Sequence, residues 1–366
     1  MNKERIAIYP FSTECNVFSD FCDMIGENYC LVEAASPLVW GLTDQIIKTS
    51  EGEITVRKSP AEFEKEVDTL LIPDFYISEK AESALINEIS KYMPKVRKVV
   101  YYGGFSNKGK QKLIDIAAEL SVDFKDLRDY SNSTEVHFNT IIEDIDIPLI
   151  AVAGVWENTN KFETALAINR SLKKQGYKVL QVGSRGYADM FGAVPFPDFM
   201  LDPSVSEFDK PLMFSLFLKE LVYKEKPDVI IVSIPGATQS LNGIFPNRSG
   251  VLQFITFQAM TPDYVVMCSM FETNPDVYTD MVKNLCYYRY GVSVDAISMS
   301  GMYFDISYIN ETHELSTLLA TDEQLSTSLQ KVTDNELLIT DITAEGQGDR
   351  IAEDIINKLA AENISI

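Results

Sequence analysis

Short apolar runs alternate with helical patterns along the first third of the chain. The runs have the length and composition of buried strands, and the segments between them repeat apolar residues every three or four positions. The strand-like runs are Ile6–Pro10, Leu31–Ala35, Thr69–Ile72 and Lys98–Tyr102, and the helical patterns include Glu79–Tyr92 and Lys110–Leu120. Because strands that alternate with helices usually pair in parallel, this order predicts an α/β domain with a Rossmann-like parallel sheet.

The first of these strands is not followed by a glycine-rich dinucleotide motif. Pro10–Cys15 occupies the turn where such a motif would lie. Ser12, Thr13 and Glu14 either contact a polar ligand or cap the next helix. We favour the cap, because a Ser side chain at a helix start accepts hydrogen bonds from the first N–H groups.

A second series of strands and helices follows a polar and acidic junction. The junction is expected within Asp129–Pro148, which ends in an acidic run and a proline. Strands are then expected at Leu149–Ala153, Lys178–Val182, Pro227–Pro235 and Tyr264–Met270, with a helix at Phe162–Lys174 and a tail that contains Leu315–Ala320, Glu336–Thr340 and a helix at Asp349–Ala361. We therefore predict one domain over residues 1–140 and a second over residues 141–366, whose tail adds a strand and a helix.

The turn between the strand Leu149–Ala153 and the next helix has the features of a phosphate-binding loop. The first N–H groups of a helix have no intrahelical partner and its dipole is positive there, so an anion at this turn accepts hydrogen bonds and is stabilised by the field. Lys161 would add a full positive charge. The residues expected to contact a nucleotide phosphate are Gly154, Asn158, Thr159, Asn160, Lys161, Phe162 and Glu163, and Glu157 is expected to orient water or a metal-bound group.

The spacing of this loop resembles that of dethiobiotin synthetase-like P-loop proteins, which read roughly G-T-D-x-x-V-G-K-T. Asn160 replaces the second glycine, which is tolerable because Asn enters the left-handed backbone region more readily than other non-glycine residues. Phe162 replaces the Ser or Thr whose hydroxyl holds Mg²⁺. Either Thr159 or Thr164 takes over that contact, or the metal is absent. The alternative for the whole segment is an ordinary strand-to-helix turn.

Two later turns occupy the positions where related proteins contact their ligands. Ser184 and Arg185 follow the strand Lys178–Val182, and the guanidinium of Arg185 suits an anionic group. Ser233 and Gly236 close the apolar strand Pro227–Pro235 in a segment that resembles the D-x-x-G motif. Ser233 occupies the position of the Asp in that motif. Because a hydroxyl is a weaker ligand for Mg²⁺ than a carboxylate, a second metal-binding position departs from the P-loop pattern, in addition to that of Phe162.

Composition excludes several classes of partner. The net charge of −22 argues against nucleic acid and against a membrane surface, because both recruit proteins through clustered Lys and Arg. It suits a basic peptide or a basic partner enzyme, although acidity also serves solubility. No signal peptide is visible, and the uncharged stretch Ser249–Pro262 is interrupted by Gln253, so a cytoplasmic chain without membrane helices is expected.

The metal-binding residue types are sparse. Five cysteines suit reduced thiols, and the spacing of Cys15, Cys22 and Cys30 differs from the C-x3-C-x2-C motif of radical SAM enzymes. His137 and His313 are the two histidines of the chain, and both are expected to be surface or packing residues. A zinc site or a His-dependent catalytic triad is therefore not expected.

Taken together, GVWENTNKFE, QVGSRGYADMFG followed by PFPDFM, and KPDVIIVSIPG resemble a family of clostridial peptide maturation system proteins. These occur in natural-product cassettes beside a radical SAM enzyme and a small precursor peptide. The resemblance implies an accessory role in the maturation of a ribosomal peptide, with the precursor peptide, the radical SAM enzyme or both as partners. More distantly, the chain is similar to two-domain proteins with a Rossmann-like front half and a dethiobiotin synthetase-like, P-loop NTPase-like three-layer back half.

Two kinds of function follow from these observations. In the first, the chain binds ATP or GTP at a degenerate P-loop and, if it is an enzyme, is a slow or atypical one; whether Mg²⁺ takes part is left open. In the second, it is a scaffold that kept the fold after losing the metal ligands and presents the peptide to the modifying enzyme. A homodimer is compatible with either. The sequence identifies neither the nucleotide, nor the peptide, nor the reaction.

Overall fold

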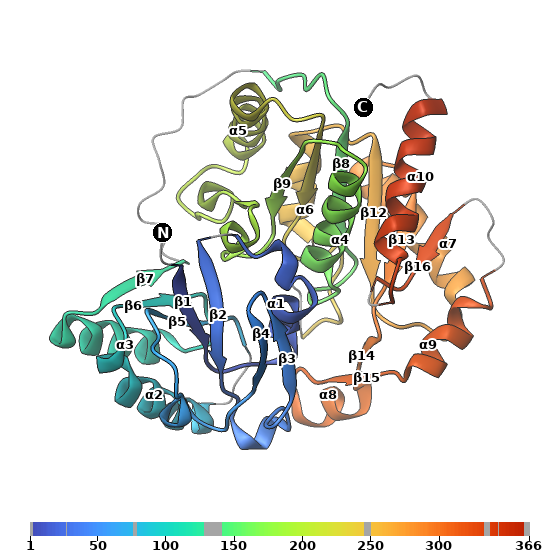
Figure 1. The fold of residues 1–366 in the computed structure, drawn as a ribbon. Helices are drawn as coiled ribbons and strands as arrows, with labels where there is room; N and C mark the ends of the chain where they lie inside the picture. Colours follow the sequence, from blue (N-terminus) through green and yellow to red (C-terminus); the bar gives the residue numbers. More distant parts are fainter. Residues whose placement is uncertain are drawn as a thin grey trace. The chain divides into compact units, whose positions relative to one another are not determined.

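The computed structural model describes residues 3–26, 28–75, 79–127, 141–244, 250–332, 337–342 and 344–361 (Figure 1). The chain forms two compact units. The first contains Met1–Asn132 and the short segment Asp189–Gly192, and the second contains Ser133–Ala188 and Ala193–Ile366. Residues 128–140, where the expected junction begins and His137 lies, are outside the described residues. The other histidine, His313, is exposed at the end of a short helix.

The first unit is built on a five-stranded parallel sheet of order β2-β1-β5-β6-β7. Its strands are β1 (Glu4–Ile8), β2 (Tyr29–Ala34), β5 (Thr69–Ile72), β6 (Lys98–Tyr101) and β7 (Asp123–Asp126), and its helices are α1 (Val17–Asp20), α2 (Glu79–Tyr92) and α3 (Asn107–Leu120). An antiparallel hairpin, β3 (Ile46–Thr49) and β4 (Gly52–Thr55), lies in the connection from β2 to β5. The Rossmann-like parallel sheet predicted from the apolar runs is confirmed.

The expected cap at Ser12 is wrong. Ser12 precedes the short 3-10 helix η1 (Thr13–Asn16), but its side chain makes no capping hydrogen bond, and its oxygen lies 3.6 Å from the Sγ atom of Cys15. A single turn of 3-10 helix leaves fewer unpaired N–H groups for a side chain to satisfy than a full α-helix does.

The second unit contains a seven-stranded parallel sheet of order β10-β9-β11-β8-β12-β13-β16. Its strands are β8 (Leu149–Gly154), β9 (Val179–Gly183), β10 (Val194–Pro195), β11 (Val229–Ser233), β12 (Tyr264–Ser269), β13 (Ala296–Met299) and β16 (Leu338–Thr340). Its helices are α4 (Lys161–Lys174), α5 (Asp209–Glu225), α6 (Val251–Gln258), α7 (Pro275–Tyr290), α8 (Ile306–Thr312), α9 (Asp322–Leu329) and α10 (Gln347–Ala361). A small antiparallel pair, β14 (Met302–Phe304) and β15 (Thr317–Leu319), follows β13.

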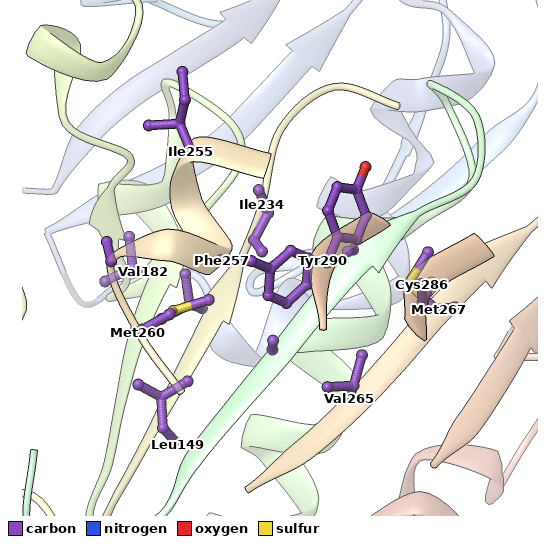
Figure 2. Packing of buried hydrophobic residues seen from close by; sticks show 14 of the residues in the cluster. Leu149, Val182, Ile234, Ile255, Phe257, Met260, Val265, Met267, Cys286 and Tyr290 are labelled. Atoms are coloured by element: carbon purple, nitrogen blue, oxygen red, sulfur yellow. The ribbon is translucent and has the colours of Figure 1, made fainter. Parts of the chain in front are cut away.

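One face of this sheet is covered by α5, α6 and α7. Their apolar side chains form a continuous core with residues of β8, β9, β11 and β12. Figure 2 shows part of that core, where Phe257 of α6 and Tyr290 of α7 stack with ring centroids 5.0 Å apart. Burying each large apolar side chain of this kind contributes about 1.5–3 kcal/mol, so this core stabilises the position of every strand end described below.

The opposite face is covered by α4 and α10 (Figure 1). Gly348 permits their close approach, because a Cβ atom there would lie 2.8 Å from the Cβ of Ala167. Tyr264 of β12 donates a hydrogen bond to Asp354 of α10. The result is a three-layer α/β arrangement, which confirms the predicted fold class.

Within the residues described, no helix is both long enough and apolar enough to cross a membrane.

Candidate functional site

The loop after β8 lies at the centre of the second sheet. β8 pairs with β11 on one side and with β12 on the other, and all three strands are parallel. After β8 the chain continues to β9, which lies on the far side of β11. It later forms β12 on the opposite side of β8. Such a reversal of strand order leaves a crevice at the carboxyl ends of the strands, where open α/β sheets bind ligands.

The backbone of the loop turns sharply twice before α4 begins. Asn158 and Asn160 have φ values of +56° and +58°, in the left-handed region. Asn160 is the N-cap residue of α4, and its side chain makes no capping hydrogen bond. The replacement of the second glycine by Asn160 is therefore accommodated in a left-handed conformation, and the cap leaves the first turn of α4 open to another acceptor.

Gly154 lies directly beneath the folded loop. A Cβ atom at this position would lie 2.7 Å from Oγ1 of Thr159, 2.8 Å from Cδ of Lys161 and 2.8 Å from the carbonyl oxygen of Trp156. These distances are shorter than real carbon contacts, so any side chain larger than hydrogen would displace the loop. The glycine is required here because the loop folds back onto the end of β8.

Lys161 opens α4 with its side chain turned into the loop. The residue is 8% exposed, and Nζ donates a hydrogen bond of 3.1 Å to the carbonyl oxygen of Trp156. Thr159 donates to the same oxygen through Oγ1, also at 3.1 Å. Within the described chain, no carboxylate forms a salt bridge with Lys161. Its ammonium group is thus buried with one neutral hydrogen-bond acceptor.

Burial lowers the pKa of Lys161, because removing a charged ammonium from water favours its neutral form. The positive charge of Arg185 lowers this pKa further. The neighbouring carboxylates Glu157 and Glu163 oppose the shift. The loop therefore gathers two basic and two acidic side chains around the first turn of α4.

The side chain of Phe162 points away from the loop. The residue is 1% exposed, and its ring packs edge-on against Tyr187 with centroids 6.0 Å apart. A Cβ atom on Gly183 would lie 2.8 Å from this ring, so Phe162 fills the space between α4 and the end of β9. The ring of Phe162 lies in the core and does not contact a ligand in the loop. The predicted contact of Phe162 with a phosphate can therefore be made only by its backbone N–H group.

The hydroxyl groups expected to replace the missing metal ligand are both engaged in other hydrogen bonds. Thr159 is bound to Trp156, as described above, and Oγ1 of Thr164 lies 3.2 Å from Oγ of Ser298 and accepts from Sγ of Cys268 at 3.5 Å. Among the residues that the structure describes, no group of three or more His, Cys, Asp or Glu side chains could hold a metal ion. The residues present do not fit Mg²⁺ at its usual position in a P-loop.

The other two predicted segments meet next to β8. Oγ of Ser233, fully buried at the end of β11, donates to Oγ of Ser184 at 2.9 Å. Arg185 is adjacent and half-buried, and Gly236 follows with a φ of +84°. The residues predicted from three separate segments therefore gather at the carboxyl ends of neighbouring strands.

Sequence reasoning missed Gln253, which lies on α6 beneath this site. Its amide is fully buried, and Nε2 donates to the carbonyl oxygens of Gly154 at 3.0 Å and Gly236 at 3.2 Å. Its Oε1 accepts from Oγ1 of Thr238 at 2.6 Å and from the Tyr290 hydroxyl at 3.3 Å. The sequence signal for it is an amide inside the apolar stretch Ser249–Pro262.

No family model and no curated protein matches this chain. Among solved structures, it is similar to a DUF1611 family protein from Anabaena variabilis, with a TM-score of 0.60, 12% sequence identity, and coverage of 97% of this chain and 100% of that one. A likeness at this identity is one of fold, and it extends along nearly the whole chain.

Looser similarities connect the chain with two further proteins. A GTPase from Pyrococcus abyssi has a TM-score of 0.29 at 12% identity, covering 58% of this chain and 97% of its own. Chloroplast FtsY from Physcomitrella patens has a TM-score of 0.33 at 12% identity, covering 77% of this chain and 90% of its own. These values are too low to support an argument about the site.

Proposed function

We propose that the loop Gly154–Glu163 binds the phosphate group of a nucleotide, with ATP and GTP as the first candidates. The observation that carries the proposal is the buried ammonium of Lys161, whose hydrogen-bond partner within the described residues is the Trp156 carbonyl. A charged group is rarely kept out of water unless an opposite charge compensates it. A phosphate at the first turn of α4 would supply that charge.

The surroundings of Lys161 support an anion more than a cation. Arg185 adds a second positive charge, and the N-terminus of α4 adds the partial positive charge of the helix dipole. Glu157 and Glu163 partly offset this field. We expect the ligand to place its phosphate between Lys161 and Arg185, with Glu157 free to orient a water molecule.

Any hydrolysis of the bound nucleotide should be slow. Phe162 and Ser233 remove the two side chains that usually position Mg²⁺, and the hydroxyls of Thr159 and Thr164 are held in hydrogen bonds within the protein. The chain is on this account either an atypical nucleotide-dependent enzyme or a binding protein that uses the nucleotide as a structural ligand.

The biological role that we propose is that of an accessory factor in the maturation of a ribosomal peptide natural product. The support for it is the resemblance of the three sequence segments to the clostridial maturation proteins, together with a net charge of −22 that would attract a basic peptide or enzyme. A non-catalytic scaffold that presents the peptide is the second candidate, and it is favoured by Phe162 and Ser233.

Calorimetric titration of the full chain with ATP, GTP, ADP and pyrophosphate tests the phosphate site. A charge-assisted hydrogen bond contributes about 1.5–3 kcal/mol, so Lys161→Ala should weaken the affinity roughly ten- to a hundredfold. Lys174→Ala, on the exposed end of the same helix, is the matched control and should leave the affinity unchanged. If the folded wild-type chain binds none of these ligands, the proposal is wrong.

A further inference from the structure

Glu272 is a half-buried carboxylate close to the phosphate loop. It follows β12, and its backbone is fixed on both sides, because the N–H of Phe271 donates to the Met302 carbonyl at 2.7 Å and Ser328 donates to the Glu272 carbonyl. Burial raises the pKa of Glu272, as expected for an acid removed from water. The backbone of Glu272 is therefore held next to β14 and α9.

The carboxylate of Glu272 has no cationic partner among the described residues. Nζ of Lys331 donates to the Thr273 carbonyl at 3.3 Å and forms no salt bridge with Glu272. Burial raises the pKa of Glu272, and no basic group opposes this shift. A half-buried carboxylate without a counter-charge is partly desolvated, and a bound cation would compensate it.

Aromatic side chains lie near this carboxylate. The hydrogen bond from the N–H of Phe271 to β14 holds Glu272 beside that strand. Tyr278 belongs to the buried core against which Trp156 packs. Burial raises the pKa of Tyr278, and the charge of Glu272 raises it further. Trp156 in turn packs edge-on against Phe304 of β14, with centroids 5.7 Å apart and planes at 87°. Glu272, Tyr278, Trp156 and Phe304 therefore form one contiguous cluster, which we name the acidic aromatic cluster.

Two buried hydroxyls lie at the same sheet edge. The hydroxyls of Ser269 and Ser300 are fully buried and find no hydrogen-bond partner in the part of the chain that the structure describes. Ser269 is the last residue of β12 and Ser300 follows β13, and the N–H of Ser300 donates to the Ser269 carbonyl at 2.8 Å. Buried hydroxyls are nearly always satisfied in native proteins, by protein, water or ligand.

We infer that the acidic aromatic cluster is a binding subsite for an organic cation, a protonated amine or a guanidinium group. The carboxylate of Glu272 would accept a charge-assisted hydrogen bond from the cation, and the rings of Trp156, Tyr278 and Phe304 would lie around it, as aromatic groups do in other cation sites. The same residue, Trp156, presents its carbonyl to Lys161 and its ring to this cluster. A ligand that spans both sites would carry a phosphate and an amine on opposite sides of Trp156.

The inference deepens the proposed function, because it names the amino group of a peptide, or a basic side chain, as the chemistry recognised next to the phosphate. It does not depend on the phosphate site for its test. A nucleobase is the competing occupant, since it also offers N–H donors and a flat ring, but it carries no positive charge to compensate Glu272.

Intrinsic fluorescence provides a direct measurement. The chain has two tryptophans, so Trp40→Phe leaves Trp156 as the single indole. This variant is titrated with butylamine, agmatine and lysine amide, with butanol as the uncharged control, and separately with ATP and pyrophosphate. We expect a saturable change of Trp156 emission with the amines and none with butanol.

Two further substitutions in the Trp40→Phe background separate the hypotheses. Glu272→Gln should weaken amine binding roughly tenfold or more, keep pyrophosphate binding, and leave the unfolding midpoint equal or higher because an uncompensated charge is removed. Glu323→Gln, exposed on α9, should change neither. Lys161→Met should lose pyrophosphate binding and keep amine binding, so the phosphate site and the cation subsite can fail independently.

Three outcomes overturn the inference. The amines produce no saturable change, or Glu272→Gln binds them as tightly as its parent, or Glu272→Gln alters the affinity for ATP while amines remain without effect. The last result would assign the cluster to a nucleobase.

Discussion

Gln253 Nε2 donates a hydrogen bond to the carbonyl oxygen of Gly154 at 3.0 Å, although 98 residues separate the two in the chain. The N–H of Thr238 donates to the same oxygen at 2.9 Å, and the N–H of Val155 donates to the Cys268 carbonyl at 2.9 Å. The peptide that leads from β8 into the phosphate loop is thus held from both sides. The buried amide of Gln253 on α6 therefore helps to fix the position of the loop, together with the loop's own residues.

Replacing Gln253 by Glu should destabilise the fold in a pH-dependent manner. A carboxylate oxygen would face the carbonyls of Gly154 and Gly236, so the folded state would favour the protonated acid and raise its pKa above the ordinary value of about 4.3. The folded state would then bind more protons than the unfolded state, and stability would fall as the pH rises through the raised pKa.

Urea unfolding of Gln253→Glu at pH 5 and at pH 8, both above that ordinary value of roughly 4.3, checks this expectation. The loss at the higher pH should be about 2–4 kcal/mol. The Gly236 carbonyl loses its amide donor, at about 1–3 kcal/mol, and the Gly154 carbonyl loses one donor but keeps those of Thr238, at about 0.5–1.5 kcal/mol. Gln258→Glu, exposed on the same helix, is the control and should unfold like wild type. Equal stability of Gln253→Glu and wild type at pH 8 would contradict the bond pattern.

Lys161→Met should stabilise the ligand-free protein while abolishing most phosphate affinity. Replacing a buried, poorly compensated charge by an apolar side chain of similar length often stabilises a fold by about 1–4 kcal/mol, and we expect the low end here because the Trp156 carbonyl already accepts from the ammonium. Thermal unfolding should therefore show a raised midpoint, whereas Lys174→Met should stay within about 0.5 kcal/mol of wild type.

The advantage of Lys161→Met should shrink as the pH rises. The folded-state pKa of Lys161 is lowered, so below the ordinary value of 10.5 the unfolded chain binds more protons than the folded one. The contribution of Lys161 to the free energy of unfolding of the wild type therefore rises with pH below this value. The Lys161→Met variant has no such pH dependence. A constant difference between the two proteins up to pH 10 would refute a buried, depressed lysine.

Gly154→Ala should displace the phosphate loop. The added methyl group would lie 2.8 Å from the Trp156 carbonyl and 2.7 Å from Thr159 Oγ1, so the loop must move. Overpacking of this kind costs about 1–3 kcal/mol, and the movement should also reduce phosphate affinity. Gly243→Ala is the matched control, because a Cβ atom there meets nothing within 4 Å. Calorimetry with pyrophosphate should find the control unchanged and Gly154→Ala impaired.

The sequence was sufficient for the parts of this fold that follow from periodicity. Most of the parallel strands have apolar runs long enough to recognise, although β7, β10 and β13 are too short or too polar. The spacing of the motifs indicates Gly154, Lys161, Arg185 and Ser233 as site residues. What the sequence could not provide were the contacts made across long separations. Three features depend on which strands become neighbours in the sheet: the burial of Phe162 against Gly183, the Gln253 network and the acidic aromatic cluster. The local sequence contains no signal for the order of the strands.

Short elements were the other difficulty. β15 lies within the expected tail segment Leu315–Ala320, but the sequence pattern does not predict its partner β14. Each strand has three residues and β15 is exposed throughout, so neither has an alternating apolar pattern. The hairpin of β3 and β4 was missed for a related reason, because it stands in a connection where the alternation of strand and helix predicts a helix. Tertiary pairing, rather than local propensity, determines these segments.

Magnesium should change nucleotide affinity little. The ring of Phe162 is buried, and Ser233 is bound to Ser184, so neither supplies an oxygen to the metal. Titration of ATP in the presence of Mg²⁺ and then of EDTA measures the ratio directly, and steady-state phosphate release measures turnover. Turnover at the roughly 1–100 s⁻¹ of efficient kinases would contradict this expectation and would turn attention to Glu157 and Glu163 as metal-binding carboxylates.

The partner proposal makes its own prediction about salt. If the net charge of −22 attracts a basic precursor peptide or the radical SAM enzyme, the immobilised chain should retain either partner at low ionic strength and release it as salt is added. The attraction acts over a Debye length of about 8 Å at physiological ionic strength and about 3 Å at 1 M, so a contact that survives 1 M salt must depend on apolar or directional bonds instead.

The pull-down is best performed with the neighbouring cassette products, with and without nucleotide, and with Glu272→Gln in parallel. Retention of the peptide by wild type but not by Glu272→Gln would place a basic group of the peptide at the acidic aromatic cluster, because the two proteins differ by one charge in a total of −22 and should not differ in long-range attraction. Capture of neither partner at low salt, together with unchanged peptide maturation after deletion of the gene, would remove the accessory role and leave only the question of which phosphate ligand the loop binds.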